Sequence, residues 1–145
     1  MPFFKTEANR QTKDVETMLS MSEQLILAFR NGVQAYLEGD RERFESQVSQ
    51  NDQLYQKLSE LNQNLINELY LRPMASGLNS TIADLIGRVY SISQITHECI
   101  QLFYAESPKI PEELKNSFIR LNELASLGGE ASIPASRAFF VDIRA

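Results

Sequence analysis

The sequence predicts an all-α protein, folded as an up-down-up-down antiparallel bundle of four long helices. Apolar residues recur at steps of three and four along nearly the whole chain, and no stretch alternates at the period of two that a half-buried strand needs. The breaks between the periodic segments are short, which is typical of helices that pack antiparallel to their neighbours. With 145 residues, of which 43% are hydrophobic, the chain suits one domain with one core.

The first helix is predicted from about Lys13 to Glu38, so that residues 1–12 form an N-terminal tail and residues 13–145 a single helical-bundle domain. Gly39 and Asp40 end this helix, because glycine tolerates the left-handed conformation of a helix C-cap. The apolar stripe consists of Val15, Met18, Leu19, Leu25, Ile26, Phe29, Val33, Tyr36 and Leu37.

The second helix is predicted from about Arg41 to Leu71, with Asp40 as its N-cap. Arg72-Pro73 ends it, since a residue that precedes proline avoids the helical region. Its stripe consists of Phe44, Val48, Tyr55, Leu58, Leu61, Leu65 and Leu69.

The third helix, from about Ala75 to Tyr104, carries only the charges of Asp84, Arg88 and Glu98. A helix so poor in charge is expected to be covered on more than one side, by other helices or by a partner. Its small polar residues indicate either close packing inside the bundle, which we favour, or a partner contact. The apolar positions are Leu78, Ile82, Leu85, Val89, Ile92, Ile95, Cys99, Ile100 and Phe103, and the small polar residues are Ser76, Ser80, Thr81, Ser91, Ser93 and Thr96.

The fourth helix is predicted to start at Pro111, where the acidic residues that follow suit the positive end of the helix dipole. Gly128-Gly129 and Pro134 interrupt it, so the helix either breaks near Gly128 and restarts, or kinks. The segment from Ala135 to Ala145 regains an apolar face and ends without a cap, as a helix cut within its length would. The stripe is Ile110, Leu114, Phe118, Leu121 and Ala125, followed by Ala138, Phe139 and Ile143.

Charge and composition argue against several classes of function. The net charge is -5 and the 14 basic residues are scattered, whereas a nucleic-acid surface needs clustered Lys and Arg. Cys99 is the only cysteine, so no internal disulfide can form, and the chain reads as cytoplasmic. No signal peptide and no apolar stretch of roughly 18 to 20 residues is present, so we expect no direct membrane insertion.

We expect no enzyme, and no catalytic, cofactor-binding or metal-binding residue. His97 and Cys99 point about 160° apart on a helix, so they cannot easily share a metal. The favoured interpretation of His97 is a partly exposed helix residue, and that of Cys99 a small core residue. A diiron bundle needs Glu-x-x-His on two helices, but this chain has Gln94 in place of the glutamate and no second histidine.

Two further residue groups are open to a functional interpretation. The carboxylates of Glu38, Asp40, Glu42 and Glu45 could bind Ca²⁺ or Mg²⁺, although a solvated helix junction paired with Arg41 and Arg43 is favoured, since the spacing is not that of an EF-hand. The exposed-face tyrosines could anchor an interface, although ordinary bundle edges are favoured. These are Tyr55, Tyr70, Tyr90 and Tyr104.

From Asp14 to Phe103, about two thirds of its length, the chain resembles one repeat of a PhoU-like domain, the helical fold of phosphate-uptake regulators. The first helix ends in the Tyr-Leu-Glu-Gly-Asp of residues 36–40, as that repeat does. The second helix follows with the run from Phe44 to Asp52, and the third begins with the Leu-Arg-Pro-Met-Ala-Ser-Gly-Leu of residues 71–78. The opening residues 1–5 and the late residues 136–140 are similar to PhoU-like relatives that regulate phosphate transport.

The resemblance implies regulation by contact, because PhoU-like proteins restrain phosphate transporters and their sensor kinases. The chain would then have a transporter or sensor partner, and lie at the inner membrane through that partner. Many PhoU proteins bind metal clusters through Glu/Asp-x-x-x-Asp motifs, but residues 92–96 hold no carboxylate and Gln50 and Gln56 flank Asp52, so the metal role is not carried over.

A full PhoU protein has two repeats, so a dimer could supply the second, and we expect a homo-oligomer. Two alternatives stay open. The first is a structural or oligomerisation bundle without a phosphate role. The second is an enzyme or metal store, which would have to contain a transition metal.

Overall fold

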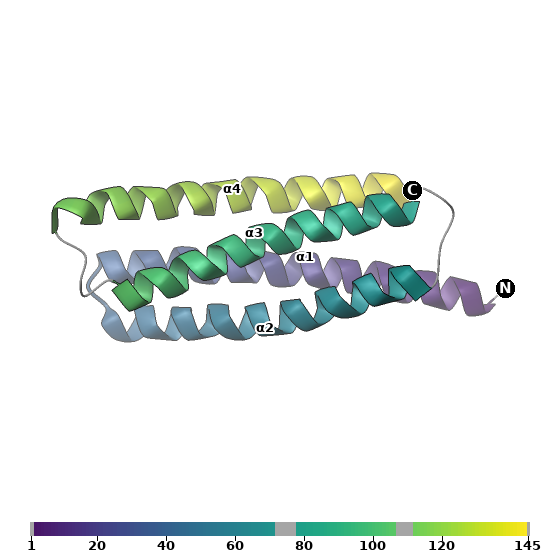
Figure 1. The fold of residues 1–145 in the computed structure, drawn as a ribbon, viewed down its shortest axis with the longest axis horizontal. Coiled ribbons are helices and arrows are strands. Elements are labelled where there is room, and N and C mark those ends of the chain that lie inside the picture. The colour runs from purple at the N-terminus through teal and green to yellow at the C-terminus, as the bar shows by residue number, and fades with distance from the viewer. Residues whose placement is uncertain (1, 72–77, 107–111, 145) are drawn as a thin grey trace.

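The computed structural model is a bundle of four long helices, and it describes residues 2–71, 78–106 and 112–144. The helices are α1 (Pro2–Leu37), α2 (Arg41–Leu71), α3 (Leu78–Glu106) and α4 (Glu112–Arg144). Successive helices run in opposite directions, so the beginning of α1 and the end of α4 lie at the same end of the bundle (Figure 1). The predicted all-α, up-down-up-down antiparallel architecture is confirmed.

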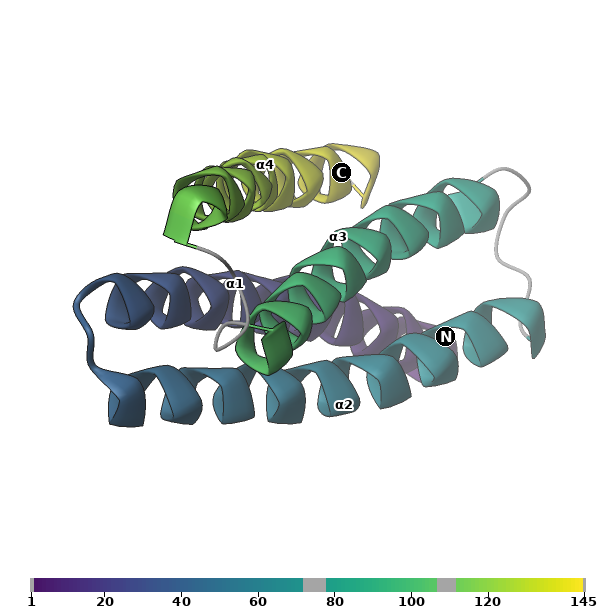
Figure 2. The ribbon, with the colours of Figure 1, turned by 60° about the vertical axis from the view of Figure 1, so that its left-hand side comes forward.

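The helices are not equivalent in their neighbours. Both α1 and α3 pack against all three other helices, whereas α2 and α4 lie at opposite edges and do not touch within the described residues (Figure 1). The third helix runs obliquely across α1 and α2 (Figure 2). The prediction that the charge-poor third helix is covered on more than one side is therefore confirmed. Over the residues described, none of the helices has a stretch that is long and apolar enough to cross a bilayer.

The core has two parts, and α1 contributes to both. The first is the larger and lies along the middle of the bundle, and the second lies near the α1–α2 turn. Both contain residues of the apolar stripes predicted for the first two helices, because those stripes face the neighbouring helices. The first part comprises Val15, Met18, Leu19, Leu25, Ile26, Leu58, Leu65, Leu85, Ile86, Val89, Ile133 and Phe140; the second comprises Phe29, Val33, Ala35, Phe44, Val48, Ile100 and Phe103.

Among the described side chains, two residues of the stripes predicted for the first three helices are exposed. Leu37 is 46% exposed, because each step of four residues advances the stripe by about 40° around the helix and carries this last position past its edge. Ile95 is 55% exposed, because the step of three from Ile92 turns back by about 60°, away from the core.

The connection between α1 and α2 is built by three consecutive residues, as the sequence predicts. Gly39 has a φ of 74°, the left-handed conformation that favours glycine. Its N–H donates to the carbonyl of Tyr36 (3.1 Å), and the N–H of Asp40 donates to the carbonyl of Ala35 (2.9 Å), which is a Schellman C-cap. The carboxylate of Asp40 then accepts from the N–H of Arg43 (3.1 Å) and caps α2.

The predicted N-terminal tail is helical, so the expected start at Lys13 is wrong. The first helix begins at Pro2, and proline is favoured at the first position of a helix. Residues 5–11 include Lys5, Ala8, Arg10 and Gln11, which are strong helix formers. The predicted start at Lys13 rested on where the apolar stripe begins, but a helix can form without an apolar stripe.

The fourth helix is continuous from Glu112 to Arg144, so, of the two alternatives, the break with a restart near Gly128 is wrong. Gly129 is buried against α1, where a Cβ atom would lie 2.7 Å from Cδ1 of Ile26, and therefore serves close packing. Pro134 lies within the helix on its exposed side. Gly129 thus marks a close contact between α4 and α1, Gly128 and Pro134 lie on the exposed side, and none of the three ends the helix.

The apolar face predicted for the end of α4 is also wrong. Ala138 and Phe139 are exposed, and the residues that pack into the bundle are Ile133 and Phe140. Two ion pairs join this half of α4 to α1, between Arg137 and Glu23 and between Arg30 and Glu130 (3.0 Å). The side chains of the predicted stripe at 110, 114, 118, 121 and 125, and those of Leu78 and Ile143, lie outside the described residues.

Candidate functional site

A wide, open hollow lies between α3 and α4 among the described residues. A cavity of about 770 Å³ opens between them, and a second of about 300 Å³ adjoins it, sharing Asp84, Arg88, Ala135 and Ser136. We call the two together the α3–α4 groove. The larger cavity is lined by Ala83, Asp84, Gly87, Arg88, Ser91, Ile92, Ser132, Ala135 and Ser136, and the smaller adds Thr81, Leu85 and Phe139.

Small side chains make this groove open. Ala83, Gly87 and Ser91 are spaced by four residues and therefore follow one face of α3. No atom lies within 4 Å of the position that a Cβ of Gly87 would take. The opposite wall is formed by serines and an alanine of α4, so neither helix fills the space between them.

The groove also contains charge that the bundle does not use. Asp84 and Arg88 are both exposed, and neither forms an ion pair or a hydrogen bond within the part of the chain that is described. Charged groups near an open hollow remain available for a ligand or partner of complementary charge. The arrangement can therefore hold a molecule by contact, with one acidic and one basic group on the same wall.

The small polar residues of the third helix divide between two roles. Ser93 and Thr96 are buried, and the hydroxyl of Ser93 lies 3.0 Å from that of Ser22 and 2.9 Å from the carbonyl of Val89. The favoured prediction of close packing is therefore confirmed for these two. Ser91 instead lines the groove, and Ser76 and the side chain of Ser80 lie outside the described residues.

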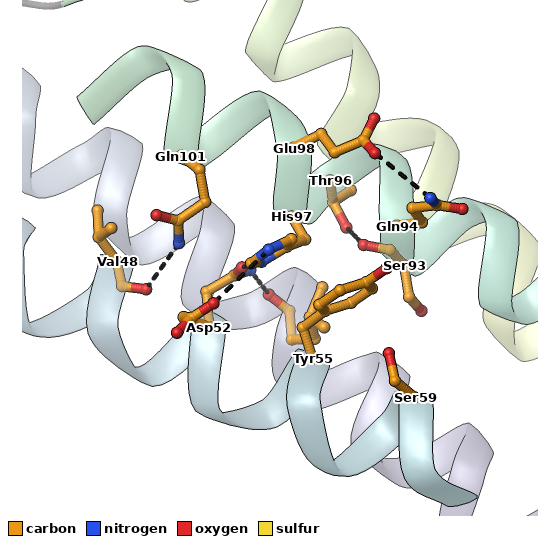
Figure 3. A network of polar contacts seen from close by, with 12 residues as sticks. Val48, Asp52, Tyr55, Ser59, Ser93, Gln94, Thr96, His97, Glu98 and Gln101 are labelled. Atoms are coloured by element: carbon orange, nitrogen blue, oxygen red, sulfur yellow. Dashed lines mark hydrogen bonds and ion pairs between the residues drawn. The ribbon is translucent and has the colours of Figure 1, made fainter. Parts of the chain in front are cut away.

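A polar network between α2 and α3 surrounds His97 (Figure 3). The imidazole stacks on the ring of Tyr55, with centroids 4.0 Å apart, and its Nδ1 lies 2.9 Å from Oδ1 of Asn51. Its Nε2 lies 3.6 Å from a carboxylate oxygen of Asp52. The side chain is 13% exposed, so the expectation of a partly exposed helix residue is confirmed, with most of the ring covered by the neighbouring helix.

The contacts of Asn51 fix the tautomer of His97. Asn51 is fully buried, and its amide nitrogen donates to the backbone carbonyl of Leu25 on α1 (3.1 Å). Its Oδ1 therefore faces the imidazole as an acceptor, so the Nδ1 of His97 carries the proton. The lone pair of Nε2 then faces Asp52. Burial lowers the pKa of His97, while the carboxylates of Asp52 and Glu98 oppose this effect.

This arrangement predicts that acid destabilises the fold through His97. Because its pKa is lowered from the ordinary value of 6.5, the unfolded chain binds the proton more readily than the native one. The contribution of His97 to stability is complete above 6.5 and is lost as the pH falls through the lowered pKa. Urea unfolding between about pH 8 and 5.5 should show this decrease, and His97→Gln should remove part of it. An identical pH dependence in both chains would contradict the assignment.

The described residues bring together no obvious metal site. No group of three or more His, Cys, Asp or Glu side chains gathers anywhere in residues whose side chains are described. Gln94, which replaces the diiron glutamate, donates to the carboxylate of Glu98 (3.3 Å). Cys99 is half-buried and packs against the core, as expected, and burial raises the pKa of its thiol.

Two of the four acidic residues at the α1–α2 junction are paired with arginines, as the favoured interpretation predicts, and Asp40 caps α2. Glu38 pairs with Arg43 (2.9 Å) and Glu45 with Arg41 (3.3 Å). Such exposed pairs contribute little to stability. The carboxylates therefore act as helix-end charges here.

The tyrosines belong to the bundle itself rather than to a free face. The hydroxyls of Tyr55 and Tyr90 lie 3.0 Å apart, and Tyr104 packs edge-on against Phe44 with centroids 5.5 Å apart. The favoured prediction of bundle edges is confirmed for these three, and the side chain of Tyr70 lies outside the described residues.

Sequence reasoning missed both the groove and the Asn51–His97 contact. The four-residue spacing of Ala83, Gly87 and Ser91 was a signal for the groove, because it places small residues on one helix face. Asn51 lies three residues after Val48, where an apolar residue would continue the stripe of α2, and that polar substitution indicated a buried hydrogen bond.

Comparison of the chain with models of known protein families, with curated proteins and with solved structures found no match. A proposal for the function therefore depends on the α3–α4 groove, on the exposed faces of the bundle and on the residues of the sequence.

Proposed function

We propose that this chain is a PhoU-like regulatory or accessory protein that modulates a phosphate transporter or its signalling partner by protein contact, and that it catalyses no reaction. The α3–α4 groove is the observation that supports this proposal. On this account the protein works at the cytoplasmic side of the inner membrane, held there by its partner.

The chemistry of the groove suits a helix of a partner protein. Grooves between two helices commonly receive a third helix, whose side chains enter at the spacing of one helical face. Small residues such as Gly87 and Ser91 let a third backbone approach closely, and Ile92 offers an apolar contact at the base. Asp84 and Arg88 would select a partner helix that carries one charge of each sign.

The family resemblance supports the same proposal from a different direction. Residues 36–40, which resemble the end of the first helix in a PhoU-like repeat, form the Schellman turn between α1 and α2. The segment of residues 71–78 lies largely outside the described residues. The resemblance therefore supports the fold of a PhoU-like repeat more strongly than it supports a role in phosphate uptake.

A second candidate function is a structural or oligomerisation bundle without a phosphate role. The outer side of α4 favours it, because Leu124 and Leu127 are 56% and 60% exposed there. Exposed apolar residues on one helix face are typical of an interface. This candidate predicts a defined self-association and no membrane partner.

An affinity pull-down from detergent-solubilised native membranes, read by mass spectrometry, tests the proposal. The tagged chain should recover a phosphate transporter or its sensor kinase, relative to a tag-only control. Ser91→Arg fills the groove with a long charged side chain and should lower that recovery by at least about tenfold. Ser46→Arg makes the same substitution at an exposed position of α2 and should recover as much as the unchanged chain.

Two results would contradict the proposal. Recovery of nothing but the chain itself would favour the structural bundle. Equal recovery by Ser91→Arg and Ser46→Arg would mean that the partner binds outside the α3–α4 groove.

A further inference from the structure

The outer side of α4 carries an apolar stripe that the bundle leaves uncovered. Its residues recur alternately at three and four positions, and all six are exposed and uncharged. We call this stripe the outer seam; it consists of Leu124, Leu127, Ala131, Pro134, Ala138 and Val141. The opposite side of α4 packs into the bundle through Gly129, Ile133 and Phe140.

The spacing of the outer seam is the heptad spacing of two helices that pack along each other. A helix that merely covers one side of a globular core presents a broader apolar face on that side alone and polar residues opposite. Here the bundle-facing side is already satisfied, and α4 itself lies at the edge of the bundle away from α2 (Figure 1). The pattern therefore indicates a further helix beside α4.

We propose that the outer seam is the interface of a homodimer, in which α4 of a second copy lies antiparallel to it about a two-fold axis between residues 131 and 134. An antiparallel pair of equivalent helices is closed by a two-fold axis, so the same surface serves both copies. This inference goes beyond the proposed function, because the seam and the groove share no residue.

The seam is complementary to itself in that orientation. The two-fold axis brings Leu124 opposite Val141, Leu127 opposite Ala138, and Ala131 opposite Pro134 of the second copy. The leucine at 127 thus meets a small residue, so the two helices can stay at a more even distance along the dimer interface. A parallel pair would instead stack leucine on leucine and alanine on alanine, which gives layers of unequal width.

The charges beside the seam also fit a second copy. Glu130 and Arg137 border it on the side of α1, one heptad apart. Each pairs with a residue of α1 (Glu130 with Arg30, Arg137 with Glu23), and their side chains remain 37% and 39% exposed, so a further charge can approach them from outside. In the antiparallel pair, Glu130 of one copy comes near Arg137 of the other, and the reverse holds across the two-fold axis. Opposite charges in these flanking positions set the orientation of paired helices. An antiparallel copy is therefore the occupant that both the apolar and the charged residues fit.

Sedimentation velocity of the full chain and of two facing-layer variants tests this proposal. The unchanged chain should sediment as a dimer. Leu127→Glu should lower the association constant by at least about tenfold, because it places two carboxylates in apolar layers. Ala138→Lys should do the same. The double variant Leu127→Glu/Ala138→Lys should regain dimer, since each Glu then faces a Lys of the second copy.

Leu102→Glu is the matched control, because Leu102 is 56% exposed on α3 and lies outside the seam. It should leave the association constant unchanged, and circular dichroism should show that every variant keeps its helices. A chain that stays monomeric at every concentration would overturn the dimer, as would a double variant that fails to regain it. Neither result bears on the membrane pull-down, so the dimer and the proposed function can fail separately.

Discussion

Replacing Phe103 with alanine is expected to lower the free energy of unfolding by about 3–5 kcal/mol. Phe103 is 1% exposed and joins three helices at the end of the bundle near the α1–α2 turn. Its ring centroid lies 4.6 Å from that of Tyr36 on α1 and 5.7 Å from that of Phe44 on α2, both edge-on. Truncation removes these contacts and leaves a cavity that helices fixed by their own hydrogen bonds cannot easily close.

Urea unfolding followed by circular dichroism measures this change, with equal slopes required for a two-state comparison. Leu102→Ala is the control, because the neighbouring residue is exposed and should change stability by no more than about 0.5 kcal/mol. Equal losses of stability at positions 102 and 103 would contradict the orientation of α3 in which Phe103 is buried and Leu102 is exposed.

Replacing Gly129 with leucine is expected to cost about 1–3 kcal/mol, because α1 leaves no room for a side chain there. A Cβ atom would approach Cδ1 of Ile26 to 2.7 Å and Cγ1 to 3.1 Å, and Ile26 is itself only 3% exposed. Either α4 moves away from α1 or Ile26 leaves its position in the core. Thermal and urea unfolding should both detect the loss.

The preceding glycine provides a control of opposite sign. Gly128 is exposed and no atom lies within 4 Å of its Cβ position, so Gly128→Leu meets nothing. It should raise stability by up to about 0.8 kcal/mol, the helix propensity that glycine lacks. A loss at position 128 as large as that at position 129 would contradict the packing of α4 against α1.

The helices α1 and α2 could be predicted well because the apolar stripe that locates each helix in the sequence is also the face that it buries in the core. Their stripes are single, and the turn between them combines a glycine in the left-handed conformation with an aspartate cap. Helix-forming residues without a stripe were less informative. Residues 2–12 hold helix-forming residues but no apolar stripe, so the sequence indicates a tail where the structure has the beginning of α1.

The fourth helix shows why apolar periodicity can mislead. Both sides of α4 are apolar near its end, and the sequence does not say which one meets the bundle. The predicted face includes Phe139, whereas Phe140 is the buried residue, and a difference of one residue turns a side chain by about 100° around the helix. Gly129 resembles a helix breaker in the sequence, because its packing against Ile26 joins positions that are far apart in the chain.

The α3–α4 groove could not be derived from the sequence for a similar reason. A groove depends on the separation of two helices, which is set by side chains elsewhere in their interface. The sequence indicated that α3 carries small residues, but not whether a neighbouring helix would fill the space beside them. Buried Ser93 and groove-lining Ser91 differ only by their position around the helix.

Photo-crosslinking in native membranes tests the central claim, that a partner protein is held in the α3–α4 groove, most directly. A benzophenone amino acid would replace Ser91 in the groove and, in a separate chain, the exposed Ser46 of α2. The account predicts a covalent adduct with a phosphate transporter or its sensor kinase from position 91 and none from position 46. Adducts of equal yield at both positions, or none with such a protein at position 91, would contradict it.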